Sequence, residues 1–191
     1  MSKVVKQTND VFISEADQYV FGQGTHYEIY KKLGAHMCTH DGKDGVFFAV
    51  WAPNAQDVYV IGEFNGWNET ANKMERIGEG GIYTTFIENV SEGQMYKYLI
   101  ELADGRKLYK ADPYANYAEL RPGTASRVYD LNHFEWNDSK WMTAREKKDM
   151  NKEPLAIYEC HIGSWMKHPD GTEDGFYTYR QFADRMIEYL K

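Results

Sequence analysis

Short runs of β-branched and aromatic residues recur at regular spacing between residues 46 and 131, and turn-forming residues separate them. The runs are Val46–Trp51, Asp57–Phe64, Ile82–Ile87, Met95–Leu102, Lys107–Tyr109 and Ser126–Leu131. Asn-Gly, Gly-Gly and Asp-Gly dipeptides between them are strong turn signals. Short strands at this spacing pack face to face as two antiparallel sheets. The pattern therefore predicts a mainly β fold, an immunoglobulin-like antiparallel β-sandwich.

The last part of the chain shows a different pattern. Leu155–Cys160 is an almost wholly apolar run, which is typical of a strand buried on both faces of a parallel sheet. Apolar residues at helical spacing fill the final segment, and Thr178 and Gln181 form a capping-box pattern at its start. These features predict one β-loop-α unit.

Four segments follow from these patterns. We expect an N-terminal extension over residues 1–24, the sandwich over 25–133, a linker over 134–153 and the β-α unit over 154–191. The sandwich segment is expected to begin with a short helix over Tyr27–Leu33 that Gly34 ends. Within the linker, Lys140–Lys148 is predicted to be helical, with Asp138 or Ser139 as its cap.

Charge and composition exclude several classes of function. The formal net charge is −7, whereas a protein that binds a phosphate backbone needs a basic face, so we expect no nucleic-acid partner. No apolar run approaches about 18 residues, so no membrane span is expected. The N-terminus has no apolar stretch typical of a signal peptide. Cys38 and Cys160 show no disulfide spacing, and a cytoplasmic location is expected.

Blocks of residues along nearly the whole chain resemble the glycogen branching enzymes. They are LGAH (Leu33–His36), FAVWAPNA (Phe48–Ala55), GEFNGW (Gly62–Trp67), YKY (Tyr96–Tyr98), KADPYA (Lys110–Ala115), ELRPGTAS (Glu119–Ser126) and YECHIGSW (Tyr158–Trp165). The stretch Phe176–Lys191 resembles the first barrel helix of the same enzymes. FNGW alone resembles a family-48 carbohydrate-binding module, which many starch- and glycogen-acting proteins share.

This resemblance implies a transferase of the α-amylase superfamily that acts in glycogen biosynthesis. Such an enzyme cuts an α-1,4 bond in a glucan and passes the fragment to a 6-hydroxyl, which forms an α-1,6 branch. The family's mechanism is retaining: one carboxylate attacks the anomeric carbon, and a second carboxyl group acts as acid and then as base.

The resemblance also implies that the catalytic groups lie elsewhere. A (β/α)₈ barrel needs about 250 residues, and residues 154–191 correspond only to the first β-α unit of a truncated barrel. The family's nucleophile Asp, acid/base Glu and stabilising Asp belong to later strands. We therefore expect no catalytic residue in this chain, no activity of the chain alone, and no cofactor.

Trp67 and Lys97 are the first two candidates for carbohydrate binding. The resemblance places a sugar-binding tryptophan at Trp67, which follows an Asn-Gly turn; its ring would stack on a glucose unit, unless it packs inside the sandwich. Lys97 occupies the position of the family's binding lysine. Period-2 alternation puts it on the face opposite Tyr96 and Tyr98, where it donates to sugar hydroxyls or is an ordinary solvated lysine.

Asn65 and Tyr109 are two further candidates. Asn65 could bind a sugar through its amide, or it could serve only the turn. The family's second stacking tryptophan would lie near Asp104–Tyr109, where this sequence has no Trp. Either Tyr109 replaces it or this half of the site is missing. The sandwich is accordingly expected to bind α-glucan (glycogen, amylose or maltooligosaccharide), or mainly to support the barrel.

A metal site and two other functions are alternatives to this interpretation. His36, Cys38 and His40 lie close together but have no fourth partner, so no metal site is expected. A non-catalytic glycogen-binding scaffold would not need the strand and capped helix predicted after the sandwich. A debranching or trehalose-forming relative is disfavoured by GSW at Gly163–Trp165. The leading hypothesis is the N-terminal portion of a glycogen branching enzyme, monomeric at full length.

Overall fold

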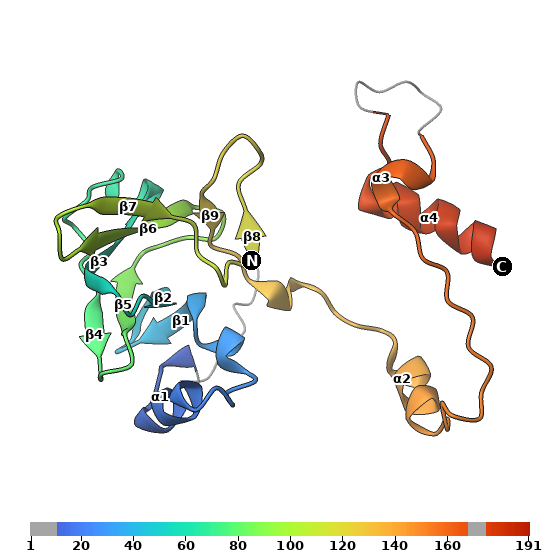
Figure 1. Cartoon of the computed structure of the whole chain (residues 1–191). Coiled ribbons are helices and arrows are strands. Elements are labelled where there is room, and N and C mark those ends of the chain that lie inside the picture. Colours follow the sequence, from blue (N-terminus) through green and yellow to red (C-terminus); the bar gives the residue numbers. More distant parts are fainter. Residues whose placement is uncertain (1–10, 168–174) are drawn as a thin grey trace. The chain divides into compact units, whose positions relative to one another are not determined.

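The computed structural model of the chain describes residues 11–167 and 175–191 (Figure 1). The chain divides into two compact units, Met1–Glu135 and Trp136–Lys191. This division lies close to the predicted end of the sandwich at residue 133. Each unit is a body in its own right and is described by itself.

Two antiparallel sheets form the first unit. One has the strand order β1-β2-β5-β4; the other has the order β3-β6-β9-β8, and β7 also pairs with β6. The strands are β1 (Gly34–His40), β2 (Lys43–Trp51), β3 (Ala55–Gly62), β4 (Glu75–Ile77), β5 (Ile82–Glu88), β6 (Met95–Leu102), β7 (Lys107–Lys110), β8 (Tyr117–Ala118) and β9 (Ser126–Arg127). The predicted antiparallel β-sandwich is confirmed. Every predicted run contains a strand, although the last is shorter than expected.

The main hydrophobic core lies between the two sheets. Phe48 of β2 and Tyr96 of β6 meet there edge to face, with ring centroids 5.1 Å apart. Both are fully buried. Other buried members of this core are Val46, Val50, Val58, Val60, Tyr83, Tyr98 and Val128. Each such side chain contributes about 2 kcal/mol when it leaves water, so this core is the main source of the unit's stability.

The start of the first sheet differs from the prediction. The helix expected over Tyr27–Leu33 is a single 3-10 turn, η2 (Ile29–Lys31), and Gly34 begins β1 instead of ending a helix. Gly34 has a φ of 113°, and a Cβ there would lie 3.1 Å from the carbonyl oxygen of Tyr114. The position therefore favours glycine on two grounds, conformation and space.

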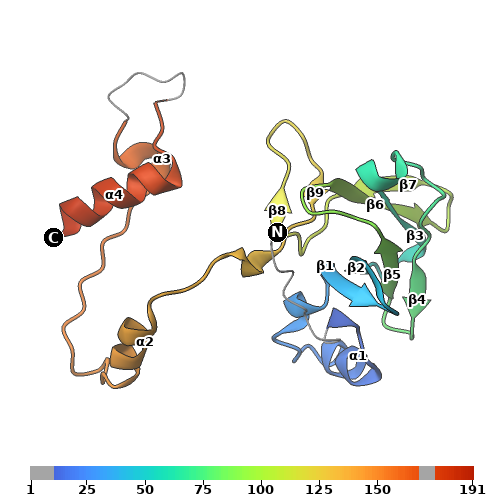
Figure 2. The same cartoon turned by 180° about the vertical axis from the view of Figure 1, so that it is seen from behind.

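The described part of the N-terminal segment is not a polar extension. Helix α1 (Glu15–Gly22) and η2 lie on the side of the first sheet that faces away from the second sheet (Figures 1 and 2). A second hydrophobic core forms there, and its buried members are Val11, Ile29, Leu33, Phe47, Ala49 and Ile82. The outward residues of β2 are apolar as well as the inward ones, so this sheet needs cover on both faces.

Asp17 fixes α1 in place. Its carboxylate accepts hydrogen bonds from the backbone and the hydroxyl of Ser14, which caps the helix. It also contacts the Nε2 atom of His26 at 2.9 Å and the ammonium of Lys32 at 3.2 Å. The first turn of α1 is thereby tied to the segment that leads into β1.

The second unit is helical in its regular parts. Helix α2 (Ser139–Glu146) confirms the helix predicted in the linker; Asp138 is its N-cap but makes no side-chain cap bond. Helix α4 (Tyr179–Leu190) begins with the predicted capping box of Thr178 and Gln181. A short helix, α3 (Ile162–Trp165), precedes it.

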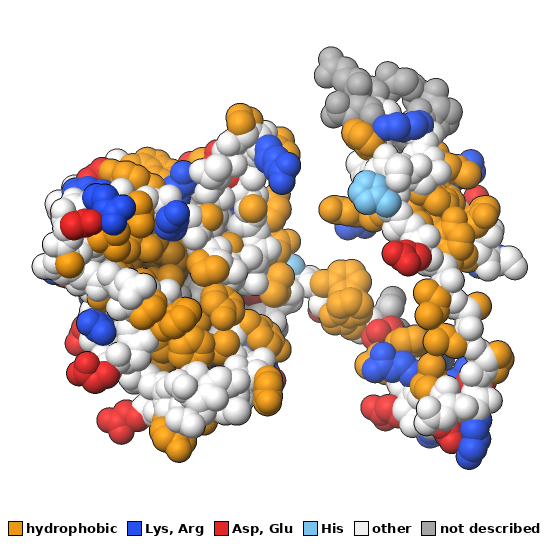
Figure 3. All heavy atoms as spheres, viewed as in Figure 1, with side chains coloured by type: hydrophobic (Ala, Val, Ile, Leu, Met, Phe, Trp, Pro, Cys, Tyr) orange, Lys and Arg blue, Asp and Glu red, His pale blue; other side chains and the backbone are white. Residues whose placement is uncertain are grey.

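The strand predicted at Leu155–Cys160 is wrong for this chain: the segment has no strand structure. A strand requires a neighbour to complete its hydrogen bonds, and no described segment pairs with this one. Its apolar side chains remain exposed, among them Leu155 and Ile157. Figure 3 shows further hydrophobic side chains on the surface over α3 and α4. The pattern indicated residues suited to burial but could not supply the partner strand.

Candidate functional site

The outer face of the second sheet forms the floor of the candidate site. On β6, Tyr96 and Tyr98 are buried in the core, and Lys97 and Leu99 point the other way. The predicted position of Lys97 on the face opposite the two tyrosines is therefore confirmed. Leu99, and Ile61 of β3, which pairs with Lys97, are buried although they lie on this outer face.

A tight turn after β3 presents Trp67. The 3-10 turn η3 (Glu63–Asn65) is followed by Gly66 with a φ of 61° and Trp67 with a φ of 59°. A left-handed conformation is uncommon for a bulky residue and costs on the order of 1 kcal/mol. Trp67 is 38% exposed. A strained backbone that holds a half-exposed tryptophan points to a role beyond packing.

Asn65 holds this turn together through all parts of its amide. Its Oδ1 atom accepts from the backbone N–H of Gly62 at 3.0 Å. Its Nδ2 group donates to the carbonyl of Val60 and to Oδ1 of Asn72. Both amide hydrogens are therefore used within the chain. The structure gives Asn65 a positioning role, and it is not among the residues that line the hollow described next.

Trp67, Lys97 and Tyr109 line one surface hollow of about 420 Å³. Its other lining residues are Ile61, Glu69, Met95, Glu119 and Ala125. Tyr109 lies on β7 opposite Leu99 and is 50% exposed. The structure thus brings together three of the four residues expected from the sequence.

Two polar contacts orient the rim of this hollow. The Lys97 ammonium donates to the Thr124 hydroxyl at 2.7 Å; an ammonium has three N–H groups, so others can reach a ligand. The Tyr109 hydroxyl donates to Glu69, whose second oxygen accepts from Lys107 at 2.8 Å. The hydrogen bonds from Lys107 and then Tyr109 lower the pKa of Glu69, and the bond to Glu69 raises the pKa of Tyr109.

Glu119 closes the hollow on the side of the β8–β9 hairpin. One of its oxygens accepts from the backbone N–H of Ala125 at 3.0 Å. A Cβ on Gly123 would lie 2.0 Å from the Glu119 carboxyl carbon, so this carboxylate occupies the space that glycine leaves free. Glycine at this position therefore lets the hairpin fold around the carboxylate.

The chemistry of the hollow suits a neutral ligand with apolar faces and many hydroxyls. Two half-exposed rings and an apolar floor provide stacking surface, and an ammonium and carboxylates provide donors and acceptors. The part of the chain that the structure describes contains no cluster of three or more His, Cys, Asp or Glu residues able to hold a metal ion.

Sequence reasoning missed Glu69, Glu119 and Thr124. All three lie outside the strands, in loops whose return to this face depends on tertiary structure. Ile61 could have been found, because it alternates with Val60 and lies beside Lys97 in the register of β3 and β6.

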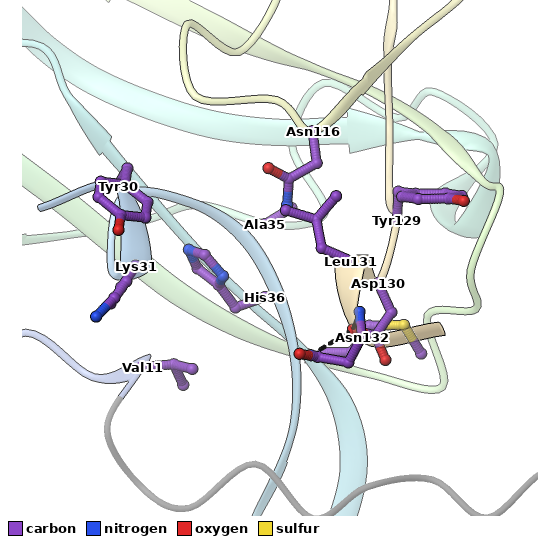
Figure 4. Close-up of a pocket in the computed structure, with 11 residues that line it drawn as sticks. Val11, Tyr30, Lys31, Ala35, His36, Asn116, Tyr129, Asp130, Leu131 and Asn132 are labelled. Carbon is purple, nitrogen blue, oxygen red and sulfur yellow. Dashed lines mark hydrogen bonds between the residues drawn. The ribbon is translucent and has the colours of Figure 1, made fainter. Parts of the chain in front are cut away.

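A second hollow, of about 330 Å³, lies between η2 and β1 on one side and residues 129–132 on the other (Figure 4). Several of its polar side chains bond within the chain. The Nε2 atom of His36 contacts the Leu33 carbonyl at 3.0 Å, and burial lowers the pKa of this imidazole. Asp130 accepts from the backbone and the amide of Asn132. The Trp67 hollow, with its strained and exposed ring, is the stronger candidate.

Comparisons with known proteins show what this chain is similar to. Residues 32–115 match the family described as carbohydrate-binding module 48 (isoamylase N-terminal domain). The chain is 70% identical, over 95% of its length, to a 1,4-alpha-glucan branching enzyme GlgB from Butyrivibrio fibrisolvens. It is 46% identical, over 93% of its length, to the enzyme of the same name from Bacillus caldolyticus. A solved structure of a putative alpha amylase from Salmonella typhimurium covers 57% of this chain and 16% of its own, at 25% identity and a TM-score of 0.43.

Fold and comparison together define the class: residues 32–115 form a carbohydrate-binding module of family 48. The chain as a whole is similar to part of the branching enzymes GlgB and spans 28% and 26% of the two relatives named above. Among the described residues, no helix is both long enough and apolar enough to cross a bilayer.

Proposed function

We propose that the sandwich binds α-glucan through the hollow of Trp67, Lys97 and Tyr109, as part of a branching enzyme that forms α-1,6 linkages in glycogen. The observation that carries the proposal is the position of Trp67. A bulky ring is held half-exposed at a φ of 59°, above an apolar floor and beside a lysine. The energetic cost of that backbone is understandable if the ring contacts a ligand.

Each side of the hollow has a distinct role in this proposal. Trp67 and Tyr109 stack on the apolar faces of glucose units, and Glu69 keeps the Tyr109 ring in place. Lys97 donates to sugar hydroxyls while Thr124 positions its ammonium. Asn65 acts through Trp67 by stabilising the turn.

The remainder of the proposal concerns the whole enzyme. We infer that the cleavage and transfer steps belong to carboxylic acids of a barrel, and that the sandwich keeps the polysaccharide near them, which raises its effective concentration. A monomeric enzyme of the cytoplasm, with no nucleic-acid or membrane partner, completes the proposal. The 70% identity to a branching enzyme supports this role over a debranching one.

The left-handed backbone of Trp67 allows a sharp test. Trp67→Gly removes the ring but relieves the strain, so the free energy of unfolding should change by no more than about 1 kcal/mol. Affinity for glycogen should fall about tenfold, because one stacking contact is lost. Electrophoresis in gels that contain glycogen measures this affinity. Trp141→Ala is the matched control, since Trp141 is an exposed tryptophan of α2. Unchanged retardation of a folded Trp67→Gly variant would refute the proposal.

A further inference from the structure

A second exposed tryptophan lies on the other side of the sandwich. Trp51 is the last residue of β2 and points away from the main core, since its neighbour Val50 is buried there. The residue is 51% exposed. It lies on the outer face of the first sheet, the face that α1 covers in part (Figures 1 and 2).

The Trp51 ring is held in one orientation. Its indole N–H donates to the carbonyl of Gly80 at 2.8 Å. The ring of Phe21, on α1, meets it edge to face at a centroid distance of 5.8 Å. Gly81, the residue after this carbonyl, has a φ of 79°, and a Cβ there would lie 2.4 Å from Cα of Pro53, so only glycine lets this turn pack against the segment after β2. An exposed aromatic ring that is already fixed loses little entropy when it binds a ligand.

The surroundings of Trp51 form a hollow of about 540 Å³. Tyr19 of α1 lines it and is 70% exposed. Gln18 and Glu79 lie at the same hollow, and within the described chain their side chains make no hydrogen bond or ion pair. The hollow thus combines two aromatic rings with an amide and a carboxylate that remain available to hydroxyl groups.

We propose that Trp51 and Tyr19 form a second contact site for α-glucan, with Gln18 and Glu79 receiving sugar hydroxyls. The ligand class rests on the proposed function, but the site shares no residue with the Trp67 hollow. Stacking of a pyranose ring on the fixed indole explains why the chain keeps half of this side chain in water.

The two sites lie on opposite outer faces of the sandwich. The Trp67 hollow is lined in part by residues of β3, β6 and β7, and the Trp51 hollow in part by residues of α1 and β2. Figures 1 and 2 show β6 and β7 on one side of the first sheet and α1 on its other side. A trisaccharide cannot lie on both at once, because two packed sheets, about 10 Å apart, separate them. A polysaccharide with many chain ends can occupy both, so the sandwich would hold glycogen bivalently and gain avidity.

Indole N–H resonances of the full chain, followed by NMR during titration with maltotriose, separate the two sites. Substitution of each tryptophan by Phe assigns the resonances. We expect the Trp51 and Trp67 resonances to shift with different saturation curves. In Trp67→Gly the Trp51 response should persist. In Tyr19→Ala the Trp51 response should need three- to tenfold more sugar, while the Trp67 response stays the same.

Tyr27→Ala is the matched control, because Tyr27 is 85% exposed in the same N-terminal segment and lines neither hollow. A Trp51 resonance that stays fixed while the Trp67 resonance saturates would overturn the second site. That result is expected if an apolar protein segment, and not a sugar, occupies the Trp51 hollow. Loss of the Trp51 response in Trp67→Gly would also overturn it. A Trp51 response without a Trp67 response would instead refute the proposed primary site and leave the second one standing.

Discussion

The Tyr96 hydroxyl donates a hydrogen bond of 2.6 Å to the carboxylate of Asp112 inside the sandwich. Asp112 is only 6% exposed, and no basic side chain is among its hydrogen-bond or ion-pair partners in the described chain. Its partners are neutral donors: Tyr96, the Tyr98 hydroxyl at 3.2 Å and the backbone N–H of Tyr114 at 2.8 Å. These hydrogen bonds connect Asp112, in the segment after β7, to the buried side of β6, the strand that carries Lys97 on its other face.

Replacement of Asp112 tests this network. Asp112→Ala should lower the free energy of unfolding by about 3 kcal/mol, because three buried donors lose their acceptor. Asp104→Ala, at an exposed carboxylate bonded to Arg106, should change it by less than about 0.5 kcal/mol. Urea denaturation followed by tryptophan fluorescence measures both. Equal midpoints for the two variants would show that the buried network adds nothing.

The same carboxylate predicts a dependence of stability on pH. Burial raises the pKa of Asp112, against the opposing effect of hydrogen bonds from Tyr96, Tyr114 and Tyr98. The folded state then binds the proton more readily than the unfolded state. Its contribution to stability is therefore greatest below the unfolded pKa of 3.8 and declines as pH rises towards the folded pKa. Urea midpoints of the natural chain and of Asp112→Asn, compared between about pH 7 and pH 4, should diverge in favour of the natural chain on acidification. A constant difference would contradict this.

Asp17 predicts the opposite dependence of stability on pH. Burial by itself would raise its pKa, but hydrogen bonds from Ser14, His26 and Lys32 together outweigh burial and lower the pKa. Its stabilisation is present above the unfolded pKa of 3.8 and is lost as pH falls below that value. Asp17→Asn should cost about 1 kcal/mol at neutral pH, the usual value of a helix cap. Hydrogen exchange of the α1 amides should be faster in the variant at neutral pH and converge with the natural chain in acid. Equal exchange rates at neutral pH would refute the anchoring role.

Glu69 should affect ligand binding without affecting the fold. Glu69→Gln removes the charge that holds Lys107 and weakens the acceptor for Tyr109, so the Tyr109 ring becomes less fixed. We expect about a threefold loss of glycogen affinity at unchanged unfolding midpoint, since exposed ion pairs contribute little to stability. Glu88→Gln breaks the comparable exposed pair with Lys43 on the other sheet and serves as the control. A loss of equal size in both variants would mean that general charge, and not Tyr109, is responsible.

The strands that sequence could predict are those whose own residues carry the signal. β2 and β6 are rich in β-branched and aromatic residues, and they were found. β1 was missed because GAHMCTH contains few such residues and owes its strand structure to pairing with β2. For the apolar run at Leu155–Cys160 the reverse holds, because the residues favour a strand but no described neighbour pairs with it.

The candidate site was also predictable only in part. Alternation along β6 gave the face of Lys97, and the resemblance to branching enzymes indicated Trp67 and Tyr109. The loop residues Glu69 and Thr124 had no local signal, since only the folded chain returns them to this face. Asn65 differs, because a turn role was one of the two alternatives that the Asn-Gly pair indicated, and its amide bonds to Val60 and Asn72 stabilise that turn.

The second core predicts where the folding unit begins. A fragment of residues 33–133 keeps both sheets but lacks Val11 and Ile29, so Phe47 and Ile82 lose their cover. It should be less stable than a fragment of residues 11–135 by at least about 3 kcal/mol, because two buried apolar side chains are removed and others are exposed.

Removing residues 136–191 should leave the melting of the sandwich unchanged, since they form a separate unit. Calorimetry of the two fragments and the full chain measures these differences. Equal melting temperatures for fragments 33–133 and 11–135 would show that the N-terminal segment is dispensable. A lower melting temperature for 11–135 than for the sandwich in the full chain would show that the two units stabilise each other.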